Sequence, residues 1–206
     1  MTRRDDLHRK ALTNLQESEV LMLDGHFDYG NGYHGRLYLN AHQIFRQPSL
    51  IWRFAQDIIE ILPETIVSAT EVVAGPVMGG ALLAHTIAGL LDGRRSLTHP
   101  LTSFAPLSLD ANGLLVVRPF YRTVISGKRV LLADDVRNTG KTFERAKSII
   151  EGAGGVVLAT VEIYDRLEAI VDLGVPNLAL AEYRAPENYA AADCPMCKTG
   201  TPITRF

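Results

Sequence analysis

The residues best suited to chemistry lie between Arg129 and Thr142, in the string RVLLADDVRNTGKT. An apolar run from Val130 to Ala133 is followed by two adjacent carboxylates, Asp134 and Asp135, and then by a polar turn that opens a helix. In open α/β sheets, ligands bind at the carboxyl ends of the strands, which is where this pattern places both acids. Carboxylates suit hydroxyl groups or a metal ion rather than an anion.

The turn after the acids suits a phosphate. It supplies backbone N–H groups, two hydroxyls and a helix N-terminus, and its residues are Arg137, Asn138, Thr139, Gly140, Lys141 and Thr142. One loop built for both hydroxyls and a phosphate indicates a sugar phosphate. The competing interpretation is a P-loop, because Gly140-Lys141-Thr142 matches the end of that motif. Its first glycine would fall at Asp135, whose carboxylate would face the phosphates, so the P-loop is disfavoured.

The elements that must position these groups alternate between helices and strands. The first part of the chain predicts helices over 5–23, 49–62 and 81–91, short strands around a tight loop over 25–40, and a β segment over 71–74. The second part predicts a strand from Val130, a helix over 141–151, and strands over 156–164 and 178–183. Residues 93–125 predict turns and short strands with no clear helix. This alternation predicts parallel crossovers in a three-layer α/β domain.

Composition restricts the class of protein. At 206 residues, a single domain is the default, and a net charge of -2 argues against general nucleic-acid binding. Apolar stretches are too short for a membrane span and residues 1–10 are too polar for a signal peptide, so we expect a cytosolic protein. The two cysteines, Cys194 and Cys197, supply only half of the ligands of a structural zinc. A metal site would need histidines or a second chain, so we expect free thiols or a weak disulfide.

The segment around Asp134 resembles the PRPP-binding motif of the type I phosphoribosyltransferases. The resemblance implies that Asp134 and Asp135 contact the ribose hydroxyls of PRPP and that residues 137–142 wrap its 5-phosphate. It also implies Mg²⁺ held through PRPP, with the two acids as candidate ligands. For Lys141, a solvated lysine at the helix start is an equal alternative to a phosphate contact.

Two further segments resemble orotate phosphoribosyltransferases. The string VVAGPVMGGA at 72–81 resembles their pyrophosphate loop, which implies pyrophosphate contacts from Gly75, Pro76, Met78, Gly79 and Gly80. Residues 25–40 resemble their N-terminal hood, which covers a planar base. Tyr38 is the candidate stacking residue, with a core tyrosine as the alternative, and His34 is a candidate base contact, with a turn cap as the alternative. Arg166, after Asp165, matches an arginine that contacts the orotate carboxylate, and a surface ion pair is its alternative.

Residues 96–125 correspond to the mobile catalytic loop of the family, which carries a lysine and closes over a neighbouring subunit's site. This chain has no lysine between Met78 and Lys128. Its arginines there are Arg94, Arg95, Arg118 and Arg122, and His99 is a further candidate cation. Because the reaction separates a pyrophosphate leaving group, cationic groups must stabilise it. Arg118 and Arg122 are the candidate catalytic substitutes, and solvated hairpin residues are the alternative.

Together these features predict a three-layer type I phosphoribosyltransferase fold with a mostly parallel sheet. A single domain of residues 1–206 is expected, with its core at about 64–164 and a small hood at about 25–45 and 165–206. The expected function is phosphoribosyl transfer from PRPP to a planar base, with orotate favoured, in a homodimer. The alternatives are a phosphoribosyltransferase for a purine or another base, and a non-catalytic regulator that binds PRPP or a nucleotide.

Overall fold

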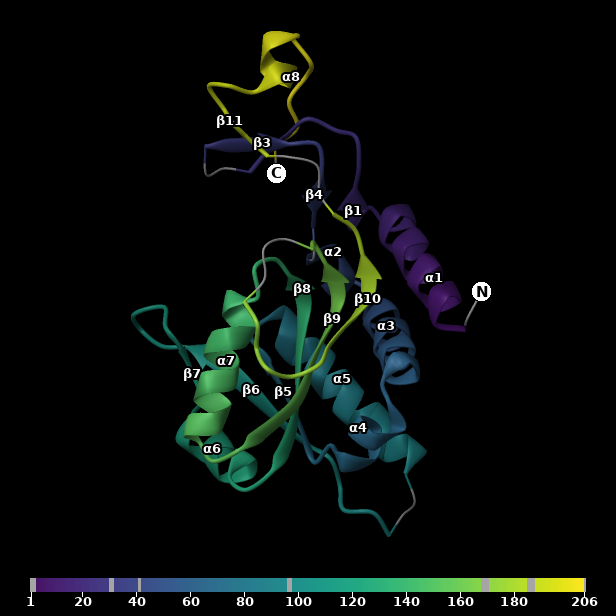
Figure 1. Ribbon diagram of the computed structural model, residues 1–206, viewed down its shortest axis with the longest axis vertical. Helices are drawn as coiled ribbons and strands as arrows, with labels where there is room; N and C mark the ends of the chain where they lie inside the picture. Colours follow the sequence, from purple (N-terminus) through teal and green to yellow (C-terminus); the bar gives the residue numbers. More distant parts are fainter. Residues whose placement is uncertain are drawn as a thin grey trace.

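A six-stranded sheet forms the centre of the molecule, in the order β10-β9-β8-β5-β6-β7 (Figure 1). The computed structural model describes residues 3–29, 32–40, 42–95, 98–167, 171–184 and 188–205. Five strands run parallel, and β7 closes the edge antiparallel to β6. The strands are β5 (Val72–Pro76), β6 (Ser103–Leu109), β7 (Leu115–Val116), β8 (Arg129–Arg137), β9 (Val156–Asp165) and β10 (Asn177–Glu182).

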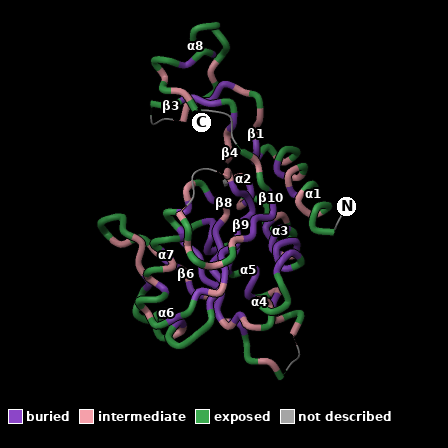
Figure 2. Tube along the Cα trace, viewed as in Figure 1, coloured by how far each residue is buried: buried purple, intermediate pink, exposed green. Residues whose placement is uncertain are grey.

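Helices cover both faces of the sheet and give the three predicted layers. The helices α3 (Pro48–Ile61) and α5 (Gly79–Arg94) pack on one face, with α1 (Arg3–Glu17) against β10. The helices α6 (Pro119–Ile125) and α7 (Lys141–Gly152) pack on the other face. Since both faces are covered, most residues of the central strands are buried, as their near-continuous apolar sequences require (Figure 2).

A smaller unit, here called the hood, stands beyond the carboxyl ends of the strands (Figure 1). It consists of residues 21–29, 32–40 and 188–205. Its strands are β1 (Leu21–Met22) paired with β4 (Tyr38–Leu39), and β2 (Phe27–Asp28), β3 (Tyr33–Gly35) and β11 (Tyr189–Ala190) in the order β11-β3-β2. The short helix α8 (Pro195–Lys198) follows β11. The first and last parts of the chain therefore meet in one small unit.

Several predicted boundaries were wrong. The N-terminal helix ends at Glu17, and Leu21–Met22 form β1 instead of a last helical turn. The helix α6 lies in a region where no helix was predicted, and α4 (Glu64–Ala69) was also missed. Both begin at a proline-marked turn and are at most seven residues long, which is too short for a periodic pattern. The predicted hood range also included β10, which pairs with β9 in the central sheet.

Helix α2 (His42–Phe45) links the hood to α3. Within the part of the chain that the structure describes, no helix is both long and apolar enough to cross a membrane.

Candidate functional site

The two acids lie at the carboxyl end of β8, as the sequence predicted. Asp134 is only 7% exposed and Asp135 is half-buried. The Asp134 carboxylate accepts the backbone N–H of Asp135 at 3.0 Å, and the Asp135 carboxylate accepts that of Val136 at 3.0 Å. Burial, and then the neighbouring Asp135 charge, raise the pKa of Asp134 well above its usual range. Two neighbouring carboxylates, one of them buried, favour a site that binds hydroxyl groups or a cation.

Glycines bring the start of α5 against these acids. A Cβ on Gly79 would collide with the Asp135 carboxylate and with the Phe45 ring at 2.5 Å. A Cβ on Gly80 would lie 2.8 Å from Asp134 Oδ1 and 2.7 Å from the Ala133 carbonyl oxygen. The start of α5 therefore packs directly against the acid pair, at a distance that only glycine permits. Of the other loop residues, Gly75 and Pro76 are buried in β5, and Met78 is 62% exposed.

The turn after β8 forms a small hollow of about 100 Å³ lined by residues 136–143. Gly140 caps α7 with a φ of 81°, a left-handed conformation that favours glycine. Arg137 is buried beneath the turn, with its Nη1 3.8 Å from an Asp165 carboxylate oxygen. Its Nε has no hydrogen-bond partner among the described residues. Asn138, Lys141 and Thr142 are exposed, and Thr139 is half-buried. The predicted phosphate turn is thus formed, with a cation beneath it.

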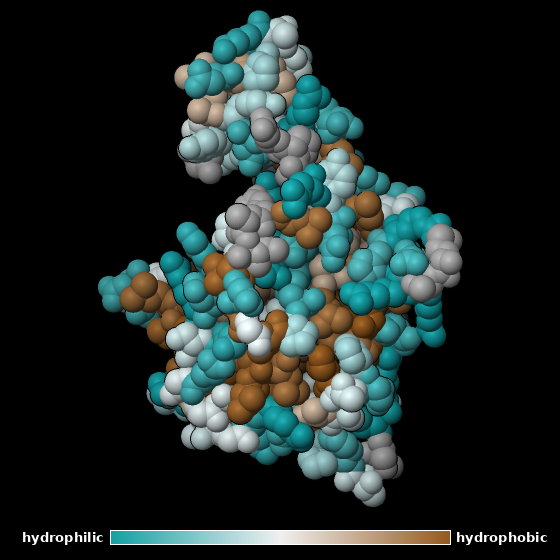
Figure 3. Space-filling view, in the orientation of Figure 1, coloured by the Kyte–Doolittle hydropathy of each residue, from teal (hydrophilic) through white to brown (hydrophobic). Residues whose placement is uncertain are grey.

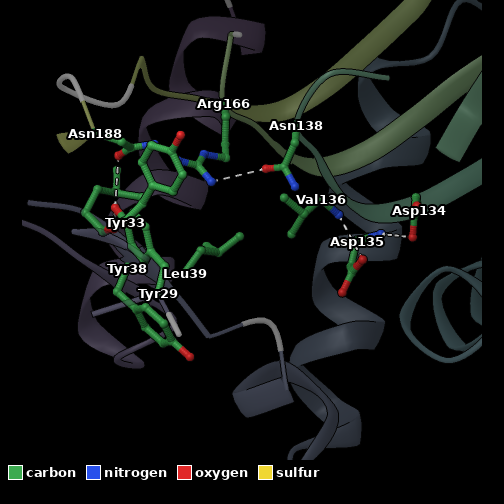
Figure 4. A pocket seen from close by; sticks show the side chains of 11 residues that line it. Tyr29, Tyr33, Tyr38, Leu39, Asp134, Asp135, Val136, Asn138, Arg166 and Asn188 are labelled. Atoms are coloured by element: carbon green, nitrogen blue, oxygen red, sulfur yellow. Dashed lines mark hydrogen bonds between the residues drawn. The ribbon is translucent and has the colours of Figure 1, made fainter. Parts of the chain in front are cut away.

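A cavity of about 670 Å³ separates the hood from the sheet (Figures 3 and 4). Figure 4 shows hood side chains on one side and the end of β8 on the other, with Arg166 reaching toward Asn138. Arg166 Nη1 donates to Asn138 Oδ1 at 3.4 Å. The lining residues are Tyr29, Tyr33, Leu37, Tyr38, Leu39, Asp134, Asp135, Val136, Asn138, Arg166 and Asn188. A cavity of this size accommodates a small ligand.

Tyr38 and Arg166 share this cavity with the acid pair, although they come from distant parts of the chain. The Tyr38 ring lies 5.7 Å from the Phe27 ring, centroid to centroid, which holds it on the hood side. The arrangement places a guanidinium and an aromatic ring opposite the groups suited to a sugar. Three polar hood residues line the cavity that were not predicted to do so: Tyr29, Tyr33 and Asn188. Tyr29 donates to Asn188 Oδ1 at 3.1 Å, a contact that the sequence does not signal.

The prediction that His34 contacts a base does not agree with this geometry. Neighbouring residues on a strand point to opposite faces, and Tyr33 is the residue of β3 that faces the cavity. His34 is 7% exposed, and its ring nitrogens face His26, Cys197 and Asp28 instead.

The predicted catalytic arginines also lie elsewhere in this chain. Arg118 precedes α6 and is exposed, and Arg122 donates to the Gly152 carbonyl at 3.1 Å, at the end of α7 opposite the phosphate turn. Neither is among the described residues that line the cavity. Arg94 pairs with Glu60 at 3.1 Å, and Arg95 donates to the Thr70 carbonyl at 2.9 Å. The first residues of the expected loop, Ser96 and Leu97, lie outside the described residues.

Glu162 is a further acid near the site that was not singled out in the sequence. It is fully buried on β9, opposite Asp134 in the register of the two strands. Asn177 donates to its Oε1 at 2.7 Å, and its Oε2 has no partner among the described residues. Burial raises its pKa to about 8. A charge-bearing residue within the apolar run VVLATVEIY was the available signal.

The raised pKa of Glu162 predicts a pH dependence of stability. The folded protein holds this proton up to about pH 8, whereas the unfolded chain releases it near the ordinary value of 4.5. Between these values the free energy of unfolding should therefore fall as pH rises, by at most about 1.4 kcal/mol per pH unit from this group. Glu162→Gln should remove that slope. Urea denaturation of both proteins at several pH values measures it. Asp134 contributes to both, since Glu162 raises its pKa less than burial and Asp135 do. Parallel slopes would contradict the assignment.

Comparison with known proteins agrees with this geometry. The sequence model of the family described as the phosphoribosyl transferase domain matches residues 40–172 of this chain. This range includes the Gly75 loop, the acid pair and Arg166. Orotate phosphoribosyltransferases are similar along nearly the whole chain. That of Heliobacterium modesticaldum is 31% identical over 95% of both chains, and that of Pelotomaculum thermopropionicum is 32% identical over 96% of both.

Solved structures share the fold. The orotate phosphoribosyltransferase of Aeropyrum pernix superposes with a TM-score of 0.64 at 19% identity, covering 82% of this chain and 92% of its own. The adenine phosphoribosyltransferase of Saccharomyces cerevisiae gives 0.60 at 18% identity, covering 84% and 99%. Since the matched segment contains both the strand that ends in the acids and the glycine loop packed against it, the chain belongs to the phosphoribosyltransferase family.

Proposed function

We propose that this protein transfers the phosphoribosyl group of PRPP to a ring nitrogen of orotate and releases pyrophosphate. The observation that carries the proposal is the single cavity shared by Asp134, Asp135 and Arg166. The acids suit ribose hydroxyls, and the guanidinium suits a planar carboxylate at the other end of the ligand. The names of the similar curated proteins support orotate as the base.

Each part of the site has a role in this reaction. The C1–O bond to pyrophosphate breaks with its electron pair on the leaving oxygen. A C1–N bond to the base forms, and the ring nitrogen gives up its N–H proton to water. Asp134 and Asp135 fix the ribose, while residues 137–142 hold the 5-phosphate with backbone N–H groups, hydroxyls and Arg137. The N-terminus of α5 and the Gly75–Gly80 loop receive the pyrophosphate. Tyr38 covers the base and Arg166 orients it, so that positioning and electrostatics supply most of the catalysis.

The acid pair fits Mg²⁺. Asp134 and Asp135 offer hard oxygen ligands in the lining of the cavity. Burial, and then the neighbouring Asp135 charge, raise the pKa of Asp134, so a bound cation would stabilise its charged form. These two carboxylates would hold the ion together with oxygens of PRPP. When bound, Mg²⁺ supplies positive charge that stabilises the pyrophosphate leaving group.

We further propose a homodimer as the working form. Arg118 lies away from the acid pair of its own chain, on the segment that follows the exposed β6–β7 hairpin. The family's catalytic loop acts on a neighbouring subunit, and a second copy of this chain would bring Arg118 to a site that lacks a loop lysine.

A steady-state assay tests the proposed function. Orotate and PRPP with Mg²⁺ should yield equal amounts of orotidine monophosphate and pyrophosphate. Adenine, guanine, hypoxanthine and uracil in place of orotate test the other bases. Pyrophosphate formed only with one of these would identify a different substrate.

The absence of a lysine between Met78 and Lys128 favours one alternative, a protein that binds PRPP without turnover. Calorimetry distinguishes the two functions. PRPP binding without pyrophosphate release for any base would establish the binding protein and contradict the enzyme.

Arg166→Lys tests the base site. Lysine keeps the charge but cannot hold a carboxylate with two parallel hydrogen bonds, so we expect KM for orotate to rise about 10- to 100-fold, with little change in PRPP affinity. Arg145→Lys, on the exposed face of α7, is the matched control and should leave both constants unchanged. An unchanged KM for orotate in Arg166→Lys would exclude Arg166 as the carboxylate contact.

A further inference from the structure

Four metal-binding side chains meet in the hood, away from the cavity. They are His26, His34, Cys194 and Cys197, and their ligand atoms all lie within 4.8 Å of one another. The sequence offered only the two cysteines as a pair. The fold adds the histidines because β11 pairs with β3, so that the chain leaving β11 toward α8 lies over the β2–β3 hairpin. Both cysteines are free thiols in the structure.

The spacing of the four atoms matches a tetrahedral metal site. With zinc–sulfur bonds of about 2.3 Å and zinc–nitrogen bonds of about 2.0–2.1 Å, tetrahedral ligands lie about 3.3–3.8 Å apart. His26 Nε2 lies 3.2 Å from His34 Nδ1 and 3.5 Å from Cys194 Sγ. Cys197 Sγ lies 3.6 Å from His26 Nε2 and 3.3 Å from His34 Nδ1. Four of the six pairs of ligand atoms therefore lie at about the distances that one ion requires, and all six lie within 4.8 Å.

The outer nitrogens of both histidines have the partners that metal-bound histidines have. His26 Nδ1 donates to the Thr201 carbonyl at 2.9 Å, which leaves a lone pair on Nε2, the atom that faces the cluster. His34 Nε2 lies 4.0 Å from an Asp28 carboxylate oxygen, which favours the proton on Nε2 and a lone pair on Nδ1. Two lone pairs then face each other across 3.2 Å, and a cation between them would convert this repulsion into coordination.

We propose that His26, His34, Cys194 and Cys197 hold a structural zinc ion that ties the two parts of the hood together. Two thiolates and two imidazoles in a tetrahedron suit zinc. His26, His34 and Cys194 are buried, whereas Cys197 is exposed, which gives the metal a path of entry. The hood has strands of only two or three residues, so a metal supplies stability that its small core cannot.

The zinc would also shape the substrate cavity. Tyr33 adjoins His34 on β3, and Asn188 precedes β11, so both lining residues are attached to the metal-bound segments. Loss of the ion should loosen the hood side of the cavity and leave the acid pair in place. The zinc proposal itself does not rest on the proposed transferase reaction or its Mg²⁺, because none of the four ligands lines the cavity.

Metal analysis of the full-length protein tests this proposal. Elemental analysis of protein purified without chelator should find about one zinc per chain. The metal-free protein should bind Co²⁺ and show the visible d–d bands of a tetrahedral site and a thiolate-to-cobalt charge-transfer band. Removing the zinc should lower Tm. This test on the unmodified protein decides the question even if a variant does not fold.

Substitutions then assign the ligands. Cys197→Ser and His34→Gln should each lose the zinc, the tetrahedral cobalt spectrum and its thiolate-to-cobalt charge-transfer band. His8→Gln, on α1, is the matched control and should keep both. The proposal is overturned if the wild type binds neither metal in this way, if it holds iron instead of zinc, or if both variants retain the ion.

Discussion

Replacing Asp134 and Asp135 together by asparagine should weaken PRPP binding by about 10²- to 10⁴-fold and abolish turnover. Each carboxylate that accepts hydrogen bonds from ribose hydroxyls contributes about 1.5–3 kcal/mol, and two are lost. Isothermal titration calorimetry with PRPP and Mg²⁺ measures the affinity, and release of pyrophosphate measures the turnover.

Stability separates a binding role from a structural one. The Asn oxygen can still accept the N–H of residue 135, and the variant removes two neighbouring negative charges, one of them buried. The ligand-free variant should therefore have the same Tm as the wild type or a higher one. Asp6→Asn, at an exposed ion pair with Arg9 on α1, is the control and should change neither property. Unchanged PRPP affinity in the double variant would refute the assignment of the ribose site.

Adding a methyl group at the start of α5 should have the second largest effect. Gly79→Ala and Gly80→Ala each place a Cβ against the acid pair or its backbone, so either the loop or the carboxylates must move. A displacement of about 1 Å in a catalytic arrangement costs on the order of 10²-fold in rate. We therefore expect kcat/KM to fall by about 10²-fold or more, measured by steady-state kinetics with PRPP as the varied substrate.

The same helix provides the matched control. Gly89 lies on the exposed face of α5, and a Cβ built there meets no atom within 4 Å. Gly89→Ala should raise the free energy of unfolding by about 1 kcal/mol, the difference in helix propensity, and leave the kinetics unchanged. If Gly79→Ala and Gly80→Ala behave like Gly89→Ala, the close approach of the loop to the acids has no role in catalysis.

The central elements of the fold were predictable because each carries its own signal. The strand β8, the turn at Gly140 and the helix α7 follow one another without interruption, so apolar patterning and turn chemistry define them locally. The edge of the sheet was harder to predict. The short helices α4 and α6 bury little of their surface, and the place of β10 depends on its pairing with β9 rather than on its own residues.

The functional residues divide in the same way. Asp134, Asp135 and the phosphate turn are contiguous, and the structure keeps them together. Predictions that rested on a single residue gave mixed results. Tyr38 and Arg166 do line the cavity, whereas His34 faces the opposite side of β3 and Arg122 lies at the far end of α7. In each case the orientation is set by strand pairing or helix packing, which a single residue does not report.

By itself, the sequence determined the family and the half of the site that we propose binds PRPP, because those residues lie on one strand, one turn and one loop. The tertiary structure decided what faces them. It joined Arg166 and the hood tyrosines across the cavity. It also brought His26 and His34 to cysteines more than 150 residues away, since His26 and Cys194 are separated by 168 in residue number. These contacts depend on how strands from the two ends of the chain pair. Such pairing is determined by the tertiary structure and not by any local segment of the sequence.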